Sequence, residues 1–170
     1  WRPNSLILFT SDNGGPDPKR LTSNGTFRAG KGSVYEGGVR ACAFANWPGQ
    51  IRSNTVVNAP LHIVDWYPTL VKLAGGKLEQ KTKLDGVDCW RTLTSDEKNS
   101  DREILINASP RGGAIRMGDW KLVVNGSRRD TEENPDGVEE KDDAEQIELF
   151  NLRDDPSEAK NLAKMNPEKV

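Results

Sequence analysis

SLILFTSDNGG, residues 5–15, runs from an apolar stretch directly into a carboxylate, an amide and two glycines. Leu6–Phe9 has the continuous apolar pattern of a strand covered on both faces, as in the parallel sheet of an α/β protein. In such sheets ligands bind outside the carboxyl ends of the strands, where Asp12 and Asn13 would lie. Two hard oxygen donors there suit Ca²⁺ or Mg²⁺. Asp-Asn-Gly-Gly is also an ordinary turn sequence, and on its own the segment favours the turn.

The rest of the first hundred residues continues this α/β pattern. Residues 39–45 form a second apolar strand candidate that ends in a Trp-Pro-Gly turn. The run DWYPTLVKLAGG predicts a helix that begins after Asp65, tolerates a proline in its first turn and ends at Gly75. Residues 77–101 are charged and loop-like. We therefore expect one domain to end near residue 100.

The pattern changes beyond that loop. REILINA and IELFNL are typical of strands, and AIRMGDWKLVV predicts a hairpin that turns at Gly118 and Asp119. DDPSEAKNLAKM predicts a helix with Asp155 at its cap and Glu158 at the third position of a capping box. These elements indicate a small antiparallel sheet packed with a helix, a second domain over residues 101–170.

Composition limits the classes of partner. The 170 residues carry a net charge of −2, so no basic field would attract nucleic acid or anionic lipid. The longest apolar run is far shorter than the roughly 20 residues of a membrane span. The first residue is Trp rather than Met, and no leader pattern opens the chain. With its rather polar composition, this predicts a fragment whose core is completed elsewhere.

The cysteines and glycosylation sequons say little about compartment. Cys42 and Cys89 lack the spacing of a zinc site and predict either two buried thiols or one disulfide. Three Asn-x-Ser/Thr triplets, at Asn24, Asn107 and Asn125, are compatible with an exported protein.

An acidic stretch at residues 126–146 holds nine acidic and three basic residues. Part of it mimics the front of an EF-hand loop, at Glu132, Asn134, Asp136 and Gly137. Its first position is not Asp and no amphipathic helices flank it, so we predict a solvated loop.

A lysine between glycines marks the next candidate site. FRAGKGSVYEGGVR, residues 27–40, places Lys31 beside Gly30 and Gly32. A lysine with such small neighbours can reach an anion without steric competition, and its compact charge suits a tetrahedral oxyanion. Taken alone, the triplet is more typical of a solvated turn.

Six segments together resemble the C-terminal half of type I sulfatases, most of all the arylsulfatase B (N-acetylgalactosamine-4-sulfatase-like) branch. They are LILFTSDNGG, KGSVYEGGVR, HIVDWYPTLVKLAGG, LDGVDCW, AIRMGDWKLV and ELFNLRDDPSEAKNLA. The resemblance implies an α/β fold: part of an alkaline-phosphatase-like sheet, followed by a small C-terminal antiparallel sheet with a helix. It also implies that Asp12 and Asn13 are metal ligands, usually to Ca²⁺ and less often to Mg²⁺. Lys31 matches the lysine that contacts the ester sulfate.

The chain departs from the family pattern in its nucleophile. Family members convert the Cys or Ser of a C/S-x-P/A-x-R motif into formylglycine, and neither Cys42 nor Cys89 has that context. The N-terminal aspartates and the sulfate-contacting histidine motif are also missing. His62, the single histidine, matches no catalytic motif, so we assign it a structural role. The resemblance therefore implies half an active site, with the formylglycine in an N-terminal half upstream.

The resulting expectation is the C-terminal part of an exported, Ca²⁺-dependent sulfatase, periplasmic, extracellular or lysosomal, acting on a sulfated sugar or an aryl sulfate. Two alternatives remain open. One is a phosphoester or phosphonate hydrolase of the same superfamily. The other is a non-catalytic sugar-binding protein derived from this fold.

Overall fold

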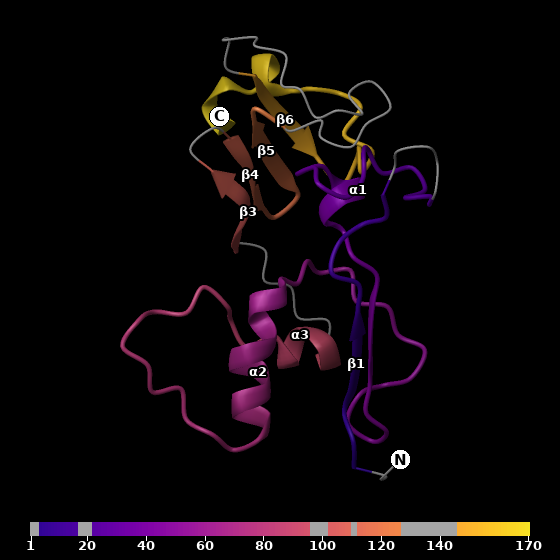
Figure 1. Ribbon diagram of the computed structural model, residues 1–170, viewed down its shortest axis with the longest axis vertical. Coiled ribbons are helices and arrows are strands. Elements are labelled where there is room, and N and C mark those ends of the chain that lie inside the picture. Colours follow the sequence, from indigo (N-terminus) through magenta and orange to yellow (C-terminus); the bar gives the residue numbers. More distant parts are fainter. Residues whose placement is uncertain (1–3, 17–21, 96–101, 110–111, 127–145) are drawn as a thin grey trace. The chain divides into compact units, whose positions relative to one another are not determined.

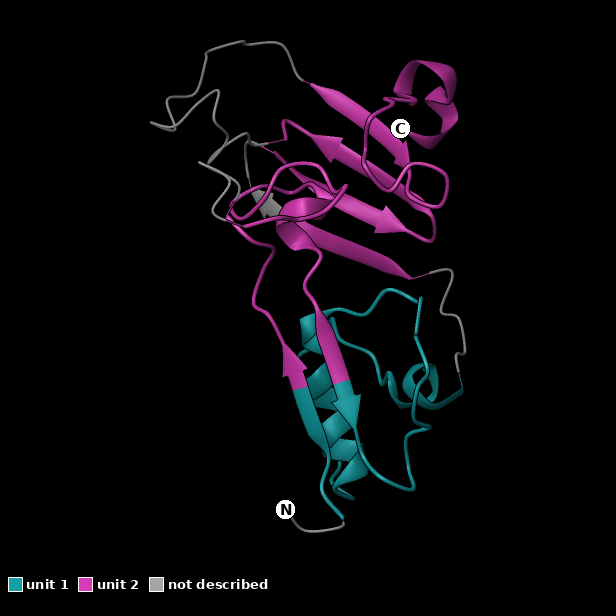
Figure 2. Cartoon of the chain, turned by 90° about the vertical axis from the view of Figure 1, so that its right-hand side faces the viewer, with its two compact units in different colours: residues 1–8, 45–100 teal, residues 9–44, 101–170 magenta. Residues whose placement is uncertain are grey.

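The computed structural model describes residues 4–16, 22–95, 102–109, 112–126 and 146–170 (Figure 1). The chain forms two compact units, residues 1–8 with 45–100 and residues 9–44 with 101–170 (Figure 2). The second unit therefore joins a segment from early in the chain to the C-terminal region. The predicted acidic loop lies, apart from its end residues, outside the described residues. No helix in the described part is long and apolar enough to cross a membrane.

Two short strands pair in a two-stranded sheet, β1 (Ile7–Thr10) and β2 (Ala43–Asn46). They run antiparallel, since Phe9 stacks on Phe44 while Ser11 N–H, further along, donates to Cys42 O at 2.9 Å (Figure 2). Both predicted strands are present, although the apolar pattern had suggested a parallel neighbour. Apolar residues show which faces are buried, not the direction of the partner strand. Here the two phenylalanine rings are 50% and 58% exposed.

The first residue of the predicted second strand, Val39, instead ends a helical turn, α1 (Glu36–Val39). Residues 40–42 are neither helix nor strand. Gly37 and Gly38 allow this turn to press against neighbouring backbone. A Cβ on Gly37 would lie 2.1 Å from Ala29 O, and one on Gly38 would lie 2.3 Å from Ser33 O. Because of this close backbone packing, the strand begins at Ala43, four residues later than predicted.

The predicted helix in the first unit is confirmed as α2 (Trp66–Leu73), which a 3₁₀ turn, η2 (Ile63–Asp65), precedes. Gly75, at φ 74°, ends it as expected. The Asp65 side chain does not cap α2; it accepts the backbone N–H groups of His62 at 2.7 Å and Val87 at 3.0 Å. His62 Nδ1 accepts the Val64 N–H, which agrees with a structural role.

The LDGVDCW segment packs against α2 and leads into α3 (Trp90–Ser95). The Thr69 hydroxyl accepts the Cys89 N–H at 2.9 Å and donates to Asp65 O at 2.7 Å. Burial raises the pKa of the Cys89 thiol. Both thiols are free, so the disulfide alternative is wrong; Cys42 is exposed, so the alternative of two buried thiols holds for Cys89 alone.

The C-terminal region forms the predicted antiparallel sheet. Its strands are β3 (Glu103–Ser109), β4 (Gly112–Met117), β5 (Trp120–Val124) and β6 (Ile147–Asn151), in that spatial order (Figure 1). Met117 pairs with Trp120 around the two-residue turn at Gly118-Asp119, so the predicted hairpin is confirmed. Gly118 adopts φ 58°, the left-handed backbone that such turns need.

The core of the second unit combines this sheet with the early segment. Val34 and Tyr35 are buried against residues from β4, β5, β6 and the turn after β6, namely Ala114, Val123, Phe150 and Leu152. The segment before α1 is therefore part of the hydrophobic core built on the C-terminal sheet.

The prediction of a C-terminal α-helix is wrong. Glu158 has φ 54°, which no right-handed helix accommodates, and the chain forms only the 3₁₀ turns η3 (Ala163–Met165) and η4 (Pro167–Lys169). Asp155 caps locally, as expected: its carboxylate accepts the Ser157 hydroxyl and the Lys160 N–H, each at 2.8 Å. The capping pattern therefore closes a turn that aims Glu158 inward.

Candidate functional site

The loop after β1 carries the two predicted metal ligands. Ser11 Oγ donates to Asn13 O and the Asn13 amide donates to Gly14 O, both at 2.8 Å. These bonds leave Asn13 Oδ1 without a hydrogen bond in the described part of the chain. Asp12 is exposed, and its carboxylate makes no ion pair or hydrogen bond with the described residues. The segment is thus a turn, as its composition favours, and it also leaves two oxygen donors available.

Two glycines bring this loop against α1. Gly14 N–H donates to Gly38 O at 2.8 Å, and a Cβ on Gly14 would lie only 1.8 Å from Gly37 O. No larger residue fits between the two backbones. Gly14 of DNGG and the two glycines of EGG therefore form the contact between this loop and α1.

Lys31 belongs to the same assembly. Its backbone N–H donates to Gly15 O at 3.0 Å, while its side chain is exposed. Asn24 bridges the loops: its amide donates to Gly15 O and Ala29 O, and its Oδ1 accepts the Gly15 N–H. The structure thus brings together the segments of all three predicted site residues, Asp12, Asn13 and Lys31. It also engages both donors of the Asn24 amide, so glycosylation there would break this bridge.

The donor set suits a hard cation only in part. Ca²⁺ takes about six to eight oxygen ligands, of which Asp12 and Asn13 would supply two. Among the described residues, no three His, Cys, Asp or Glu side chains gather in a way that could hold a metal ion. Asp12 and Asn13 therefore offer oxygen donors of a kind that Ca²⁺ accepts, but fewer than a complete calcium site needs.

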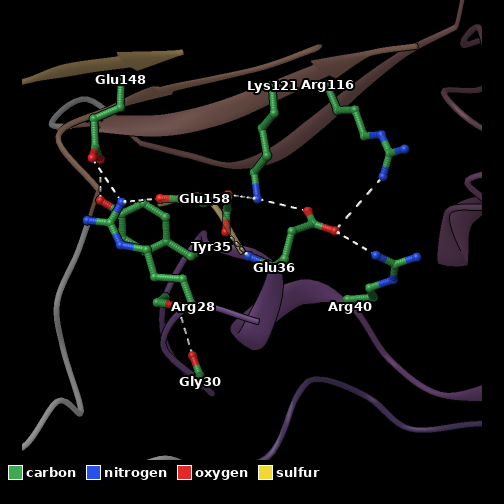
Figure 3. Close-up of polar contacts among 10 residues, drawn as sticks. Arg28, Gly30, Tyr35, Glu36, Arg40, Arg116, Lys121, Glu148 and Glu158 are labelled. Carbon is green, nitrogen blue, oxygen red and sulfur yellow. Dashed lines mark hydrogen bonds and ion pairs between the residues drawn. The ribbon is translucent and has the colours of Figure 1, made fainter. Parts of the chain in front are cut away.

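Arg28 anchors the start of the Lys31 loop (Figure 3). Its guanidinium lies 2.9 Å from Glu148 Oε1 on β6 and 3.8 Å from the centroid of the Tyr35 ring. The Tyr35 hydroxyl donates to the other Glu148 oxygen. An arginine that stacks on a ring and pairs with a carboxylate shared with that ring's hydroxyl is more rigid than a surface ion pair.

A buried ionic cluster anchors the end of the loop (Figure 3). Lys121 on β5 is fully buried, with Nζ 3.0 Å from Glu36 Oε1 and 2.8 Å from Glu158 Oε1. Glu158 Oε2 accepts the Glu36 N–H at 2.6 Å, whereas its Oε1 makes the ion pair without ordinary hydrogen-bond geometry. Arg40 and Arg116 approach the second Glu36 oxygen at 3.7 and 4.0 Å.

Burial dominates the electrostatics of this cluster. It raises the pKa of Glu158, and the charge of Lys121 opposes that rise without cancelling it. It also lowers the pKa of the Arg116 guanidinium, against the pull of Glu36. Glu36, Lys121 and Glu158 are buried charges that the sequence analysis did not identify.

One signal could have found Lys121. Side chains alternate along a strand, so Lys121 shares a face of β5 with the buried Val123. A lysine on the apolar face of a strand needs a partner, because an unpaired buried charge is very costly. The sequence around Glu158 carries no such signal, since a capping-box position already accounts for a glutamate there without any need for burial.

Comparisons with known proteins agree with the motifs. Residues 2–76 match the family model described as Sulfatase. The chain is 39% identical to arylsulfatase J of Mus musculus over 117 residues, 69% of this chain and 19% of that protein. It is 37% identical to arylsulfatase A of Bos taurus over 171 positions, 93% of this chain and 33% of that protein.

Solved structures share the fold. The crystal structure of Ps i-CgsB in complex with k-i-k-neocarrahexaose superimposes with a TM-score of 0.76 at 31% identity, over 95% of this chain and 33% of that chain. The predicted fold class, part of an α/β sheet followed by a small antiparallel sheet, is confirmed. The chain spans about a fifth to a third of the length of these relatives.

Proposed function

Because the chain belongs to the type I sulfatase family, we propose that it is the C-terminal part of an enzyme that hydrolyses sulfate esters. The observation that carries the proposal is the hydrogen-bonded pair of loops that presents Asp12, Asn13 and Lys31. An exposed carboxylate, an amide oxygen and an ammonium group on joined loops can together engage an anion held by a cation. The proposal rests on this grouping rather than on any single motif.

Each of the three residues has a distinct task. Asp12 and Asn13 would hold Ca²⁺, with Mg²⁺ as the less suitable ion, and that cation would draw charge from the sulfuryl oxygens. Lys31 binds the sulfate by its charge and stabilises the negative charge that develops as the ester bond breaks. The nucleophile would be a formylglycine in the N-terminal half of the same protein, the partner that completes the site.

We propose a sulfated sugar or an aryl sulfate as substrate. The sugar is favoured because Ps i-CgsB, which covers nearly the whole chain, was solved with an oligosaccharide bound. An exported location, periplasmic, extracellular or lysosomal, would give access to such polymers. The sequon at Asn125, whose side chain is exposed, is compatible with that location.

The test uses the full-length protein that contains this chain. It should release sulfate from a chromogenic aryl sulfate or from sulfated oligosaccharides, lose that activity to a chelator and regain it with Ca²⁺ more than with Mg²⁺. An aryl phosphate of the same alcohol is the matched control substrate. Preferential hydrolysis of the phosphate would identify a phosphoester hydrolase, and sugar binding without hydrolysis would identify a non-catalytic protein; either result would overturn the proposal.

A further inference from the structure

The loop that carries Lys31 is held at both ends by residues of the C-terminal region. At its start, Arg28 pairs with Glu148 of β6 at 2.9 Å and donates to Glu158 O at 3.4 Å. At its end, Glu36 binds Glu158 through its N–H and Lys121 through its carboxylate. Between these anchors, the Lys31 side chain is exposed and makes no hydrogen bond or ion pair with the residues that the structure describes. The position of its ammonium group therefore depends on the loop.

The loop also holds one backbone conformation that is unfavourable for its residue, because Ala29 has φ 57°. A left-handed alanine is strained and persists only where the surroundings impose it. The anchors at Arg28 and Glu36 are the contacts that enclose this strained stretch.

Stability alone is a weak reason for the ionic cluster. A buried lysine between two carboxylates must overcome a large desolvation penalty, and apolar residues of similar volume often stabilise a protein as well or better. What the cluster does provide is a fixed arrangement of its side chains, because each charge holds the others in place. Glu36 is the member that belongs to the loop, and Lys121 and Glu158 are the members that hold it.

We propose that Lys121 and Glu158 are positioning residues that set the location of the Lys31 ammonium group through Glu36. This inference rests on the proposed function and deepens it, since it makes the C-terminal sheet part of the catalytic apparatus. A displacement of about 1 Å at a reacting group can cost about a hundredfold in rate. Loosening the cluster should therefore lower kcat even where the enzyme stays folded.

The experiment compares variants of the full-length enzyme. Glu158→Gln keeps the shape and an acceptor for the Glu36 N–H but removes the charge that faces Lys121, and kcat should fall by about tenfold or more. Lys121→Met is the harsher variant, and if it does not fold, Glu158→Gln decides. Leu149→Ala is the control: Leu149 is buried on β6 outside the cluster, so this change should lower Tm and leave kcat of the folded enzyme unchanged.

A double-variant cycle separates positioning from general damage. If Glu158 acts through Lys31, Glu158→Gln should cost nothing further in an enzyme that already carries Lys31→Met. An equal loss in both backgrounds, or an unchanged kcat for Glu158→Gln alone, would overturn the inference and leave the proposed function intact. Normal turnover by Lys31→Met would instead remove the catalytic role of Lys31, on which both proposals stand.

Discussion

Lys31 is the residue whose charge the proposed chemistry needs most. The bound ester carries one negative charge that shifts toward the leaving oxygen as the bond breaks, so a fixed ammonium group favours the transition state. In the full-length enzyme, Lys31→Met should lower kcat by about 10²–10³ with little change in Tm. Lys31→Arg should restore activity only in part, because the planar guanidinium cannot occupy the same point. Steady-state kinetics with a chromogenic aryl sulfate provide the measurement.

Lys77 offers the matched control, since its side chain is 86% exposed and lies outside the loop. Lys77→Met should leave kcat/KM unchanged. If Lys31→Met also keeps more than about half of the normal kcat/KM, where loss of a catalytic donor demands a far larger drop, then Lys31 is an ordinary solvated lysine.

Gly37 is the residue on which the close packing of α1 against the backbone of Arg28 and Ala29 depends. In Gly37→Ala the new Cβ would meet two carbonyl oxygens at 2.1 and 2.4 Å, so the backbones must separate. Overpacking of this kind typically costs about 1–3 kcal/mol, and we expect a lower midpoint of urea unfolding together with a lower kcat. Gly75→Asn is the control, because Gly75 faces open space at a φ that asparagine tolerates. Equal midpoints for the two variants would contradict the close-packing argument.

Of individual residues, the sequence predicts those whose role depends on their immediate neighbours in the chain. Asp12, Asn13 and Lys31 lie in short motifs, and local glycines indicate their loops. The buried cluster could not be predicted in this way, because Glu36 is 85 residues from Lys121 and 122 residues from Glu158. Whether a charged residue is buried depends on partners that only the tertiary fold brings near.

Among the secondary-structure elements, those set by local periodicity were predictable. The hairpin at Gly118 and the end of α2 at Gly75 follow from turn and cap chemistry alone. The C-terminal turn was not predictable, because the capping pattern at Asp155 stabilises either a helix or an isolated turn. The buried pairing of Glu158 with Lys121 selects the turn.

The turn that carries Glu158 should make the stability of the enzyme depend on pH. Burial raises the pKa of this carboxyl above its ordinary value of 4.5 in the folded state. Between those two pKa values the folded protein binds more protons than the unfolded chain, so this group's contribution to stability is present at low pH and lost as pH rises. Lys121 and Glu36 are the charged groups that face this carboxyl.

The measurement compares the free energy of unfolding of the full-length enzyme and of Glu158→Gln across pH 4 to 8. Relative to the variant, the unsubstituted enzyme should lose stability as pH rises from about 4.5 through the raised pKa. A difference that stays constant with pH would show that Glu158 has its ordinary pKa when folded, and one that grows with pH would reverse the predicted sign.

At the scale of the whole molecule, many apolar side chains of the chain remain uncovered. Phe9, Phe44, Val56 and Ile63 are between half and four-fifths exposed. The polar composition predicted a core completed elsewhere, and these surfaces are what such a core would leave open. The sequence could not show which segments belong together, because the packing of Tyr35 on Phe150 joins parts far apart in the chain.

The isolated 170-residue chain should therefore be catalytically inactive and prone to association. None of its residues matches the nucleophile motif, so the purified chain should release no sulfate from a chromogenic aryl sulfate. Its uncovered apolar side chains, among them those of β1 and β2, should bind a hydrophobic dye and promote association. The full-length enzyme at equal concentration is the control, with turnover and little dye binding. Turnover by the chain alone would show that a nucleophile has been overlooked within it, and dye binding no stronger than that of the full-length enzyme would show that these surfaces are already covered.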